Sequence, residues 1–251
     1  MNNPFSLENK TILITGASSG IGRQCAIDCN KMGAKIILVG RNKKRLEEVC
    51  NELHGNNSTY VFDLNNLEKI KEFITSIVEE NGAISGFIHA AGIEKTLPIK
   101  LLTHNDYLEL YKINSLSAFE IIRQLYARKN FNDYGHIVLI SSITSIIGRG
   151  GLSAYSASKG AIISAVRPIA LEMAKRNICV NCISPGTVLT PMMQNYLSSL
   201  TIEEYNKRID GFPLGLGKTT DISLLAIYLL SDASRWVTGQ NFIIDGGYTI
   251  K

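Results

Sequence analysis

The most constraining feature of this sequence is a regular alternation between short apolar, β-rich runs and longer amphipathic stretches. Runs this apolar are typical of strands covered on both faces, and an intervening helix returns the chain to a parallel strand through a right-handed crossover. The alternation therefore predicts an α/β fold, a doubly wound parallel sheet of seven strands with helices on both faces. The expected strands are Thr11–Thr15, Lys35–Val39, Thr59–Phe62, Ile84–His89, His136–Ile140, Ile178–Ile183 and Phe242–Ile244.

The length of the chain suits one such sheet. A chain of 251 residues and 27.6 kDa lies within the range of a single α/β domain. No repeat, low-complexity tract or linker divides it, so we expect one domain over residues 1–251. The longest stretch rich in turn residues is 184–218, and we expect its part from about 187 to 217 to form a lid over the carboxyl edge of the sheet.

Composition excludes several classes of protein. With 45% apolar and 19% charged residues, the chain is neither disordered nor fibrous. The net charge is 26 − 22 = +4, too small for a typical nucleic-acid-binding domain. No apolar run approaches the roughly 20 residues that cross a bilayer, and the first ten residues lack the apolar core of a signal peptide. We therefore expect a cytoplasmic protein that binds neither nucleic acid nor membrane.

The five cysteines do not predict a metal site or a disulfide framework. Cys179 and Cys182 form a CxxC pair, but the pair lies in an expected strand, where an offset of three directs the side chains to opposite faces. Cys25 and Cys29 lie one helical turn apart with no histidine nearby. A zinc site is the alternative at each pair, and small buried apolar residues are the favoured interpretation.

A glycine-rich loop follows the first expected strand directly and leads into a helix. The segment reads Thr15-Gly16-Ala17-Ser18-Ser19-Gly20-Ile21-Gly22. Glycines here allow the backbone to approach a pyrophosphate, and the start of the helix offers free N–H groups to it. The loop predicts a dinucleotide site of the Rossmann type, and an ordinary tight turn is the alternative. The cofactor contacts expected from it are Gly16, Ser18, Ser19, Gly20, Ile21 and Gly22.

The end of the second expected strand bears on which dinucleotide binds. This place usually carries an acid for NAD or an arginine for NADP. Here the chain reads Val39-Gly40-Arg41, followed by further basic residues to Arg45 and no acid. Arg41 can bind a 2′-phosphate with two hydrogen bonds, so we expect NADP(H). The alternative is that residues 41–45 are the solvated start of a helix.

A tyrosine and a lysine provide the expected acid–base chemistry. Tyr155 and Lys159 lie four residues apart, on one face of an expected helix. A lysine cation beside a phenol favours the phenolate and lowers the tyrosine pKa from about 10. Such a tyrosine can donate a proton to a carbonyl oxygen or remove one from an alcohol. Ser142 follows the His136–Ile140 strand and is placed to hydrogen-bond the same oxygen.

These motifs resemble those of the short-chain dehydrogenase/reductase family. The glycine spacing Gly-x-x-x-Gly-x-Gly and the Ser-x12-Tyr-x3-Lys spacing of Ser142, Tyr155 and Lys159 are similar to the family's, and the likeness covers residues 9 to 248. By this resemblance Tyr155 is the general acid/base, Lys159 lowers its pKa and binds the nicotinamide ribose, and Ser142 polarises the carbonyl. Asn114 matches a helix asparagine that holds a water in the proton relay.

The resemblance also implies further cofactor contacts. Asp63 matches a family aspartate at the adenine, although a helix cap is an equally good interpretation from the sequence alone. Pro185-Gly186 and Thr190 match the segment beside the nicotinamide, and Asp245-Gly246-Gly247 matches a C-terminal signature. The full set implied beyond the glycine loop and Arg41 is Asp63, Leu64, Ala91, Gly92, Tyr155, Lys159, Pro185, Gly186, Val188 and Thr190.

Three positions depart from the family pattern or interrupt an element. The family's Asn-Asn-Ala-Gly is His89-Ala90-Ala91-Gly92 here, so a structural asparagine is missing at Ala90. His89 could be a second acid/base, but we favour a buried packing residue. Pro168 should remove one hydrogen bond from the long helix and bend it. Because this helix often packs subunits together in the family, the bend bears on assembly.

The resemblance implies an NADPH-dependent oxidoreductase that reduces a ketone to a secondary alcohol. The loop before Tyr155 resembles that of 3-oxoacyl-acyl-carrier-protein reductases, so a 3-oxoacyl thioester is the expected substrate and Arg149 a candidate for its anionic group. Sugars, polyols and steroids remain alternatives, as does a catalytically idle NADP-binding module; an epimerase is disfavoured. We expect a homo-oligomer, a tetramer or dimer. Apolar residues of the expected lid suit a carbon chain, or equally a subunit contact: Met192, Met193, Tyr196, Tyr205 and Phe212.

Overall fold

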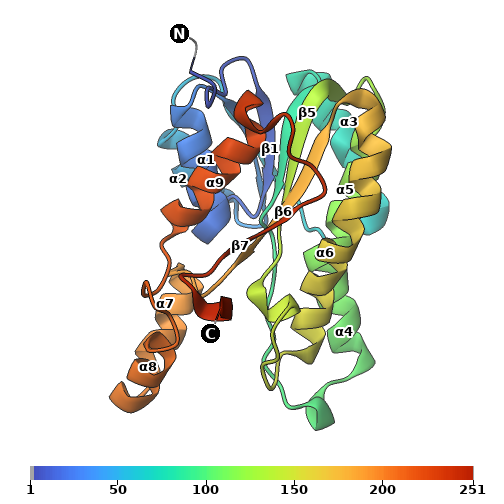
Figure 1. Ribbon diagram of the computed structural model, residues 1–251. Coiled ribbons are helices and arrows are strands. Elements are labelled where there is room, and N and C mark those ends of the chain that lie inside the picture. The colour runs from blue at the N-terminus through green and yellow to red at the C-terminus, as the bar shows by residue number, and fades with distance from the viewer. Residues whose placement is uncertain (1–2, 251) are drawn as a thin grey trace.

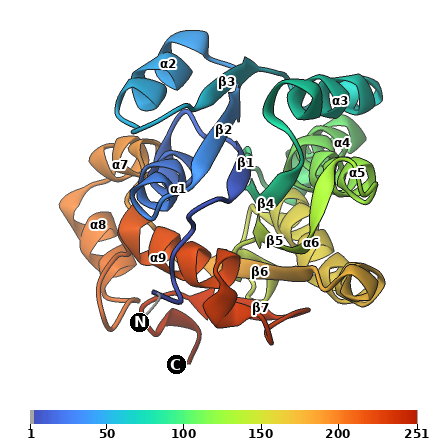
Figure 2. The ribbon, with the colours of Figure 1, turned by 90° about the horizontal axis from the view of Figure 1, so that it is seen from above.

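The computed structural model describes residues 3–250, with the side chains of all of them except Met192, Lys207 and Arg208. One sheet of seven strands runs in the order β3-β2-β1-β4-β5-β6-β7, and every neighbouring pair is parallel. Figures 1 and 2 show it with helices on both faces, which confirms the predicted doubly wound fold. The strands are β1 (Thr11–Thr15), β2 (Lys35–Gly40), β3 (Ser58–Val61), β4 (Ile84–His89), β5 (Phe131–Ile140), β6 (Cys179–Pro185) and β7 (Asn241–Ile244).

The helices divide between the two faces of the sheet. Helices α1, α2 and α9 pack on one face, whereas α3, α5 and α6 pack on the other (Figure 2). Helices α7 and α8 lie beyond the carboxyl edge, at the bottom of Figure 1. The bounds are α1 (Gly20–Lys31), α2 (Lys43–Asn51), α3 (Ile70–Asn81), α4 (His104–Tyr111), α5 (Ser117–Leu125), α6 (Ser153–Met173), α7 (Pro191–Ser198), α8 (Ile202–Ile209) and α9 (Thr219–Leu230).

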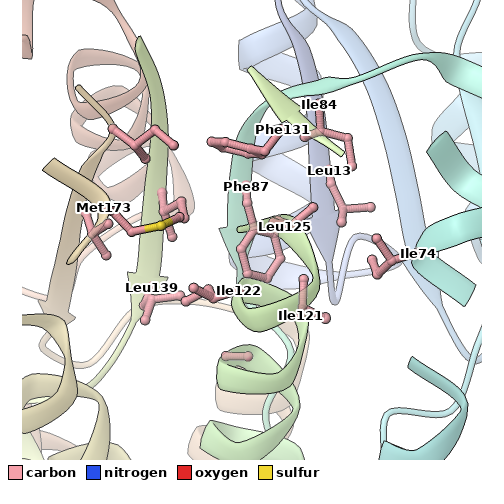
Figure 3. Packing of buried hydrophobic residues seen from close by; sticks show 14 of the residues in the cluster. Leu13, Ile74, Ile84, Phe87, Ile121, Ile122, Leu125, Phe131, Leu139 and Met173 are labelled. Atoms are coloured by element: carbon pink, nitrogen blue, oxygen red, sulfur yellow. The ribbon is translucent and has the colours of Figure 1, made fainter. Parts of the chain in front are cut away.

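The strands bury alternate residues on opposite faces. In β1, Leu13 joins the cluster under α3, α5 and α6, and its neighbours Ile12 and Ile14 join the cluster under α1 and α9. Figure 3 shows the first cluster, in which Phe87 and Phe131 are fully buried. Burying each such side chain contributes roughly 1.5–3 kcal/mol. This two-sided burial explains why the strands read as nearly continuous apolar runs.

Strand β5 begins five residues earlier than predicted. Ile84 of β4 pairs with Phe131, and Gly86 pairs with His136, so residues 132–135 bulge from the strand between these pairs. Their sequence Asn-Asp-Tyr-Gly is typical of a turn, and Tyr134 adopts a left-handed conformation with φ of 61°. The regular part of the strand begins at His136, as expected from its apolar pattern.

The predicted lid is largely helical. It carries α7 and α8, each with a threonine at its N-cap: the Thr190 hydroxyl accepts from the Met193 N–H, and the Thr201 hydroxyl accepts from the Glu204 N–H. Helix α6 continues through Pro168 to Met173. The five cysteines are free thiols, as predicted.

The order of the strands determines where a ligand can bind. Strand β1 lies between β2 and β4. From β1 the chain adds β2 and β3 on one side, and it then returns to add β4 to β7 on the other side. At such a switch point the connecting loops separate and leave a crevice at the carboxyl edge. The glycine loop and the end of β4 both lie there, because Thr15 pairs with His89.

Candidate active site

A cavity of about 920 Å³ lies at this crevice. Its size falls within the range of ordinary small-molecule sites. The predicted residues that line it come from all parts of the chain: Gly16, Ser18, Ser19, Gly20, Ile21, Arg41, Asp63, Leu64, Ala91, Gly92, Ser142, Tyr155, Lys159, Pro185, Gly186, Val188 and Thr190. Gly22 and Asn114 lie outside the lining. A Cβ atom on Gly22 would lie 2.4 Å from the Gly16 carbonyl oxygen, so Gly22 packs the loop against itself.

The glycine loop fits an anionic ligand. Gly16 has φ of 70°, and a Cβ atom there would lie 2.6 Å from the Ala91 backbone nitrogen, so the loop lies directly on the end of β4. Ser19 precedes α1, and its side chain does not cap the helix. The first N–H groups of α1 therefore face the cavity with the positive end of the helix dipole, an arrangement that suits a pyrophosphate.

The end of β2 presents two guanidinium groups. Arg41 and Arg45 both line the cavity, and neither belongs to an ion pair within the described part of the chain. Asn42 caps α2 by accepting a hydrogen bond from the Arg45 N–H at 3.0 Å, which fixes the start of this helix. Two unpaired cations at one edge of the cavity fit a phosphate. Arg45 belongs to the basic run of the sequence, but the motif did not single it out.

Asp63 lies in the cavity lining, where the resemblance places the adenine, and it does not cap a helix, since the N-caps of the next helical segments are Asn66 and Lys69. Its carboxylate accepts from the Asn65 backbone N–H at 3.0 Å and so closes the turn after β3.

Ser142 and Tyr155 form the centre of the site. Ser142 follows β5, and its hydroxyl accepts hydrogen bonds from the Thr144 N–H at 3.2 Å and the Thr144 hydroxyl at 3.0 Å. The Ser142 hydroxyl also acts on the Tyr155 phenol, whose pKa it lowers. Both groups line the cavity, so two hydroxyls converge where one substrate oxygen can lie.

The pKa values differ from the sequence expectation. Burial raises the pKa of Tyr155 well above its usual value, and the negative charge of Glu94 adds to the rise, while the Ser142 hydrogen bond opposes it. Burial lowers the pKa of Lys159 to about 8. The Lys159 ammonium donates to the Ile140 carbonyl at 2.8 Å. Tyr155 is therefore a protonated phenol at neutral pH.

Asn114 lies behind the site, in a π-helical segment at Lys112–Leu116. The side chain is fully buried. Its Oδ1 accepts from the Ile93 N–H at 2.8 Å, and its Nδ2 donates to the Ile93 carbonyl at 3.0 Å and to the Ser158 hydroxyl at 2.9 Å. The amide thus joins the segment after β4 to α6. Single π-helical turns often occur at functional sites.

Gly92 has no side chain and so leaves room for the Lys159 ammonium and the Asn114 amide. A Cβ atom on Gly92 would lie 3.2 Å from the Lys159 ammonium nitrogen and 3.3 Å from Oδ1 of Asn114. A side chain at this position would therefore displace the lysine or the asparagine.

His89 is a buried packing residue, as favoured from the sequence. Its Nδ1 lies 2.9 Å from the Thr15 hydroxyl, and its Nε2 lies 3.2 Å from the Ile113 carbonyl. Burial and the nearby Lys159 cation lower its pKa to about 3, so the ring is neutral at physiological pH. Neutral Nε2–H donates to the carbonyl and Nδ1 accepts from the threonine. His89 lies outside the cavity lining, whereas Ala90 contributes to it.

The far end of the cavity is formed by the predicted lid and the C-terminus. Phe212 stacks on Tyr248 with ring centroids 4.5 Å apart. Tyr205 lies outside the lining, and the Met192 side chain lies outside the described residues. The lid, C-terminal and loop residues lining this end include Arg149, Met193, Tyr196, Leu200, Glu204, Phe212 and Tyr248. Sequence reasoning missed Ile93, Glu94 and Tyr248, because none belongs to a recognisable motif.

No cluster of three or more histidine, cysteine or acidic side chains among the described residues could hold a metal ion. No helix within residues 3–250 is long and apolar enough to cross a membrane.

Known proteins resemble this chain over nearly its whole length. A family model described as enoyl-(acyl carrier protein) reductase matches residues 16–249. The 3-oxoacyl-acyl-carrier-protein reductase of Thermotoga maritima is 33% identical, over 97% of this chain and 99% of that protein. The gluconate 5-dehydrogenase of Gluconobacter oxydans is 30% identical, over 98% and 97%. A crystal structure described as an NAD(P)-dependent gluconate 5-dehydrogenase of Beutenbergia cavernae, with NADP at low occupancy, is 28% identical with a TM-score of 0.89, over 99% and 100%.

Proposed function

The chain belongs to the short-chain dehydrogenase/reductase family of oxidoreductases, and on that premise we propose that it reduces a ketone to a secondary alcohol with NADPH. One observation carries the proposal. Ser142 and Tyr155 line the cavity together with the buried Lys159, which lies one helical turn from Tyr155. Because the working groups of an oxidoreductase are present, we reject a catalytically idle binding module.

Each residue of the site has a separate role in the proposed reduction. The nicotinamide supplies, when bound, the hydride that reduces the carbonyl carbon. Tyr155 donates its phenolic proton to the carbonyl oxygen and regains a proton from solvent. Ser142 donates a hydrogen bond to the same oxygen and stabilises the negative charge that develops on it. Lys159 lines the cavity and would hold the nicotinamide ribose by a hydrogen bond, and Asn114 fixes the Ile93 backbone.

Tyr155 is protonated at neutral pH, which is the form that a proton donor requires. Oxidation of an alcohol requires the phenolate instead. We therefore propose that Tyr155 acts as the proton donor in reduction.

Arg41 and Arg45 support NADPH as the cofactor. Both line the cavity without an acidic partner, and a 2′-phosphate supplies the missing negative charge. The glycine loop at α1 would hold the pyrophosphate, and Asp63 the adenine end. The related structure from Beutenbergia cavernae holds NADP, which agrees with this proposal.

Two substrate classes remain candidates. A 3-oxoacyl thioester is the first, by similarity to the Thermotoga maritima reductase and because Arg149 offers a cation for an anionic carrier. A hydroxylated substrate is the second, by similarity to the gluconate 5-dehydrogenases. One observation favours the second: Glu94 lines the cavity as an exposed carboxylate, to which a hydroxyl can donate a hydrogen bond and an alkyl chain cannot.

We also propose a cytoplasmic homo-oligomer. Five free thiols suit a reducing compartment. Exposed apolar side chains on α6 and before β7 supply surfaces for a second subunit.

The proposed function is tested by following NADPH absorbance with purified protein. A short 3-oxoacyl thioester and a hydroxylated ketone serve as substrates, and NADH serves as the control cofactor. We expect oxidation of NADPH with at least one substrate and much slower oxidation of NADH. Tight NADPH binding with no turnover of either substrate would contradict ketone reduction.

A further inference from the structure

A carboxylate lies in the cavity where no motif pointed to one. Glu94 follows β4 and shares the cavity lining with Ser142 and Tyr155. It is not needed for the proposed proton transfer. The inference that follows rests on the proposed function and concerns the part of the substrate that Glu94 would meet.

The backbone beside Glu94 is held firmly relative to Tyr155. Asn114 bonds both the N–H and the carbonyl of Ile93, the residue before Glu94. The same asparagine donates to the Ser158 hydroxyl, which in turn donates to the Tyr155 carbonyl at 2.7 Å. Two consecutive hydrogen bonds, from the Ile93 N–H to Asn114 and from Asn114 to Ser158, thus join the backbone next to Glu94 to the helix that carries the proton donor. This backbone is fixed relative to Tyr155, and the Glu94 side chain extends from it as an exposed group.

The Glu94 carboxylate has unused hydrogen-bonding capacity. Its Oε1 accepts from the Thr96 hydroxyl at 3.2 Å, and no ion pair within the described residues includes Glu94. The adjacent Lys95 pairs with Asp106 instead. Arg149 lies on the facing loop, which joins this segment through a bond from the Leu97 N–H to the Gly151 carbonyl, and it does not pair with Glu94.

Glu94 lies close enough to the reacting centre to affect it. Its negative charge contributes to the raised pKa of Tyr155. The other charged groups around Tyr155 are Lys159 on its own helix and Arg149, which lines the same cavity. The segment that carries Glu94 also lies against the catalytic lysine, since a Cβ atom on Gly92, two residues before Glu94, would lie 3.2 Å from the Lys159 ammonium nitrogen. A group bound to Glu94 would therefore lie near the carbonyl that Tyr155 protonates.

We propose that Glu94 is a specificity-determining residue whose carboxylate accepts a hydrogen bond from a hydroxyl on the carbon next to the reacting carbonyl. The preferred substrates are then α-hydroxy ketones, and the products are vicinal diols. The Glu94 side chain is exposed, so a bound substrate displaces solvent from its carboxylate, and a hydroxyl of the substrate can donate a hydrogen bond in place of that solvent. A plain 3-oxoacyl chain places a methylene group there, which displaces the solvent and offers no hydrogen bond in exchange.

The test uses two ketones that differ by one hydroxyl, 3-hydroxy-2-butanone and 2-butanone, with NADPH. We expect the wild-type protein to favour the hydroxylated ketone in kcat/KM by about tenfold to a hundredfold, the range of a charged hydrogen bond. Glu94→Ala should reduce this preference to below threefold with turnover of 2-butanone retained, and Glu94→Gln should give an intermediate preference. Glu79→Ala, an exposed glutamate on α3, is the matched control and should leave the preference unchanged.

A binding measurement separates this inference from the proposed function. Tyr155→Phe with bound NADPH should bind both ketones without reducing them, and NADPH fluorescence reports their dissociation constants. Tighter binding of the hydroxylated ketone, lost in the Tyr155→Phe, Glu94→Ala double variant, supports the role of Glu94 even if the wild type turns over neither ketone. Equal binding of the two ketones, no detectable binding of either, or a preference that survives Glu94→Ala overturns it.

Discussion

At the scale of single residues, Arg41 carries the proposed choice between NADPH and NADH. Its guanidinium lines the cavity without an acidic partner. Arg41→Ala should weaken NADPH binding by about 1.5–3 kcal/mol, because one charged hydrogen bond is lost, and should change NADH binding little. Fluorescence titration with each cofactor measures both values.

Lys44 provides the control for Arg41. It is an exposed cation on the same helix start and does not line the cavity. Lys44→Ala should leave both affinities nearly unchanged. Equal weakening of NADPH and NADH by Arg41→Ala would contradict the assigned role.

At the scale of elements, the π-helical segment Lys112–Leu116 joins the end of β4 to α6. Asn114→Ala would leave the Ile93 N–H and carbonyl and the Ser158 hydroxyl without their partner. We expect a loss of about 2–4 kcal/mol in the free energy of unfolding, together with faster hydrogen exchange in residues 93–98. Urea unfolding and exchange mass spectrometry measure the two effects.

Asn206→Ala, in the exposed face of α8, is the control for Asn114→Ala and should change neither quantity. A stable Asn114→Ala protein whose 93–98 exchange is unchanged would show that other contacts hold this segment.

The sequence predicted the sheet well because its strands are buried on both faces. Thr11–Thr15 and Ile84–His89 were located to the residue, since continuous apolar runs have no competing interpretation. The helices of the lid were not predicted, because short amphipathic segments with threonine caps resemble turns. The π-helical segment was not predicted either, since a one-residue irregularity leaves no mark on apolar periodicity.

The site was predicted where a motif fixes backbone geometry. The glycine loop and the Tyr155–Lys159 spacing each placed their residues at the cavity. Glu94 was missed because its position depends on hydrogen bonds from Asn114, a residue twenty positions away that no local pattern connects to it. The raised pKa of Tyr155 was also missed. The sequence shows the spacing between Tyr155 and Lys159, but burial has the larger effect on the tyrosine pKa.

At the scale of the whole molecule, two buried neutral histidines make folding sensitive to acid. Burial lowers the pKa of His89 to about 3 and that of His136 to about 4. Both folded pKa values lie below the unfolded value, so below about pH 6.5 the unfolded chain binds more protons. The free energy of unfolding should fall by about 2 kcal/mol between pH 6 and pH 5.

Urea unfolding at both pH values tests this dependence. His89→Gln should remove about half of the fall, and the His89→Gln, His136→Gln double variant most of it. The exposed histidines provide the control, since His54→Gln and His104→Gln should leave the pH dependence intact. A wild-type stability that stays constant from pH 6 to pH 5 would contradict the buried neutral state.

Exposed apolar side chains at one side of the molecule predict self-association. Leu171 on α6 is 77% exposed and Trp236 is 88% exposed. The turn before β7 packs on α6, since a Cβ atom on Gly239 would lie 3.6 Å from the Ala170 Cβ. Strand β7 is also an edge of the sheet, whose free backbone groups favour pairing.

Sedimentation measures this association. We expect a dimer or tetramer, and Leu171→Glu should reduce its mass because a charge would be buried at the interface. Ile202→Glu, on the equally exposed face of α8, should leave the mass unchanged. A monomeric wild-type protein at micromolar concentration would contradict the prediction.

The central claim is that Tyr155 donates the proton during NADPH-dependent reduction of a ketone. Its most direct test compares wild type with Tyr155→Phe in two measurements, NADPH affinity and NADPH oxidation with a ketone substrate. We predict nearly equal affinities and at least a hundredfold loss of turnover, because the ring remains while the only proton it offers is removed. Turnover in Tyr155→Phe within a few-fold of wild type would contradict the claim.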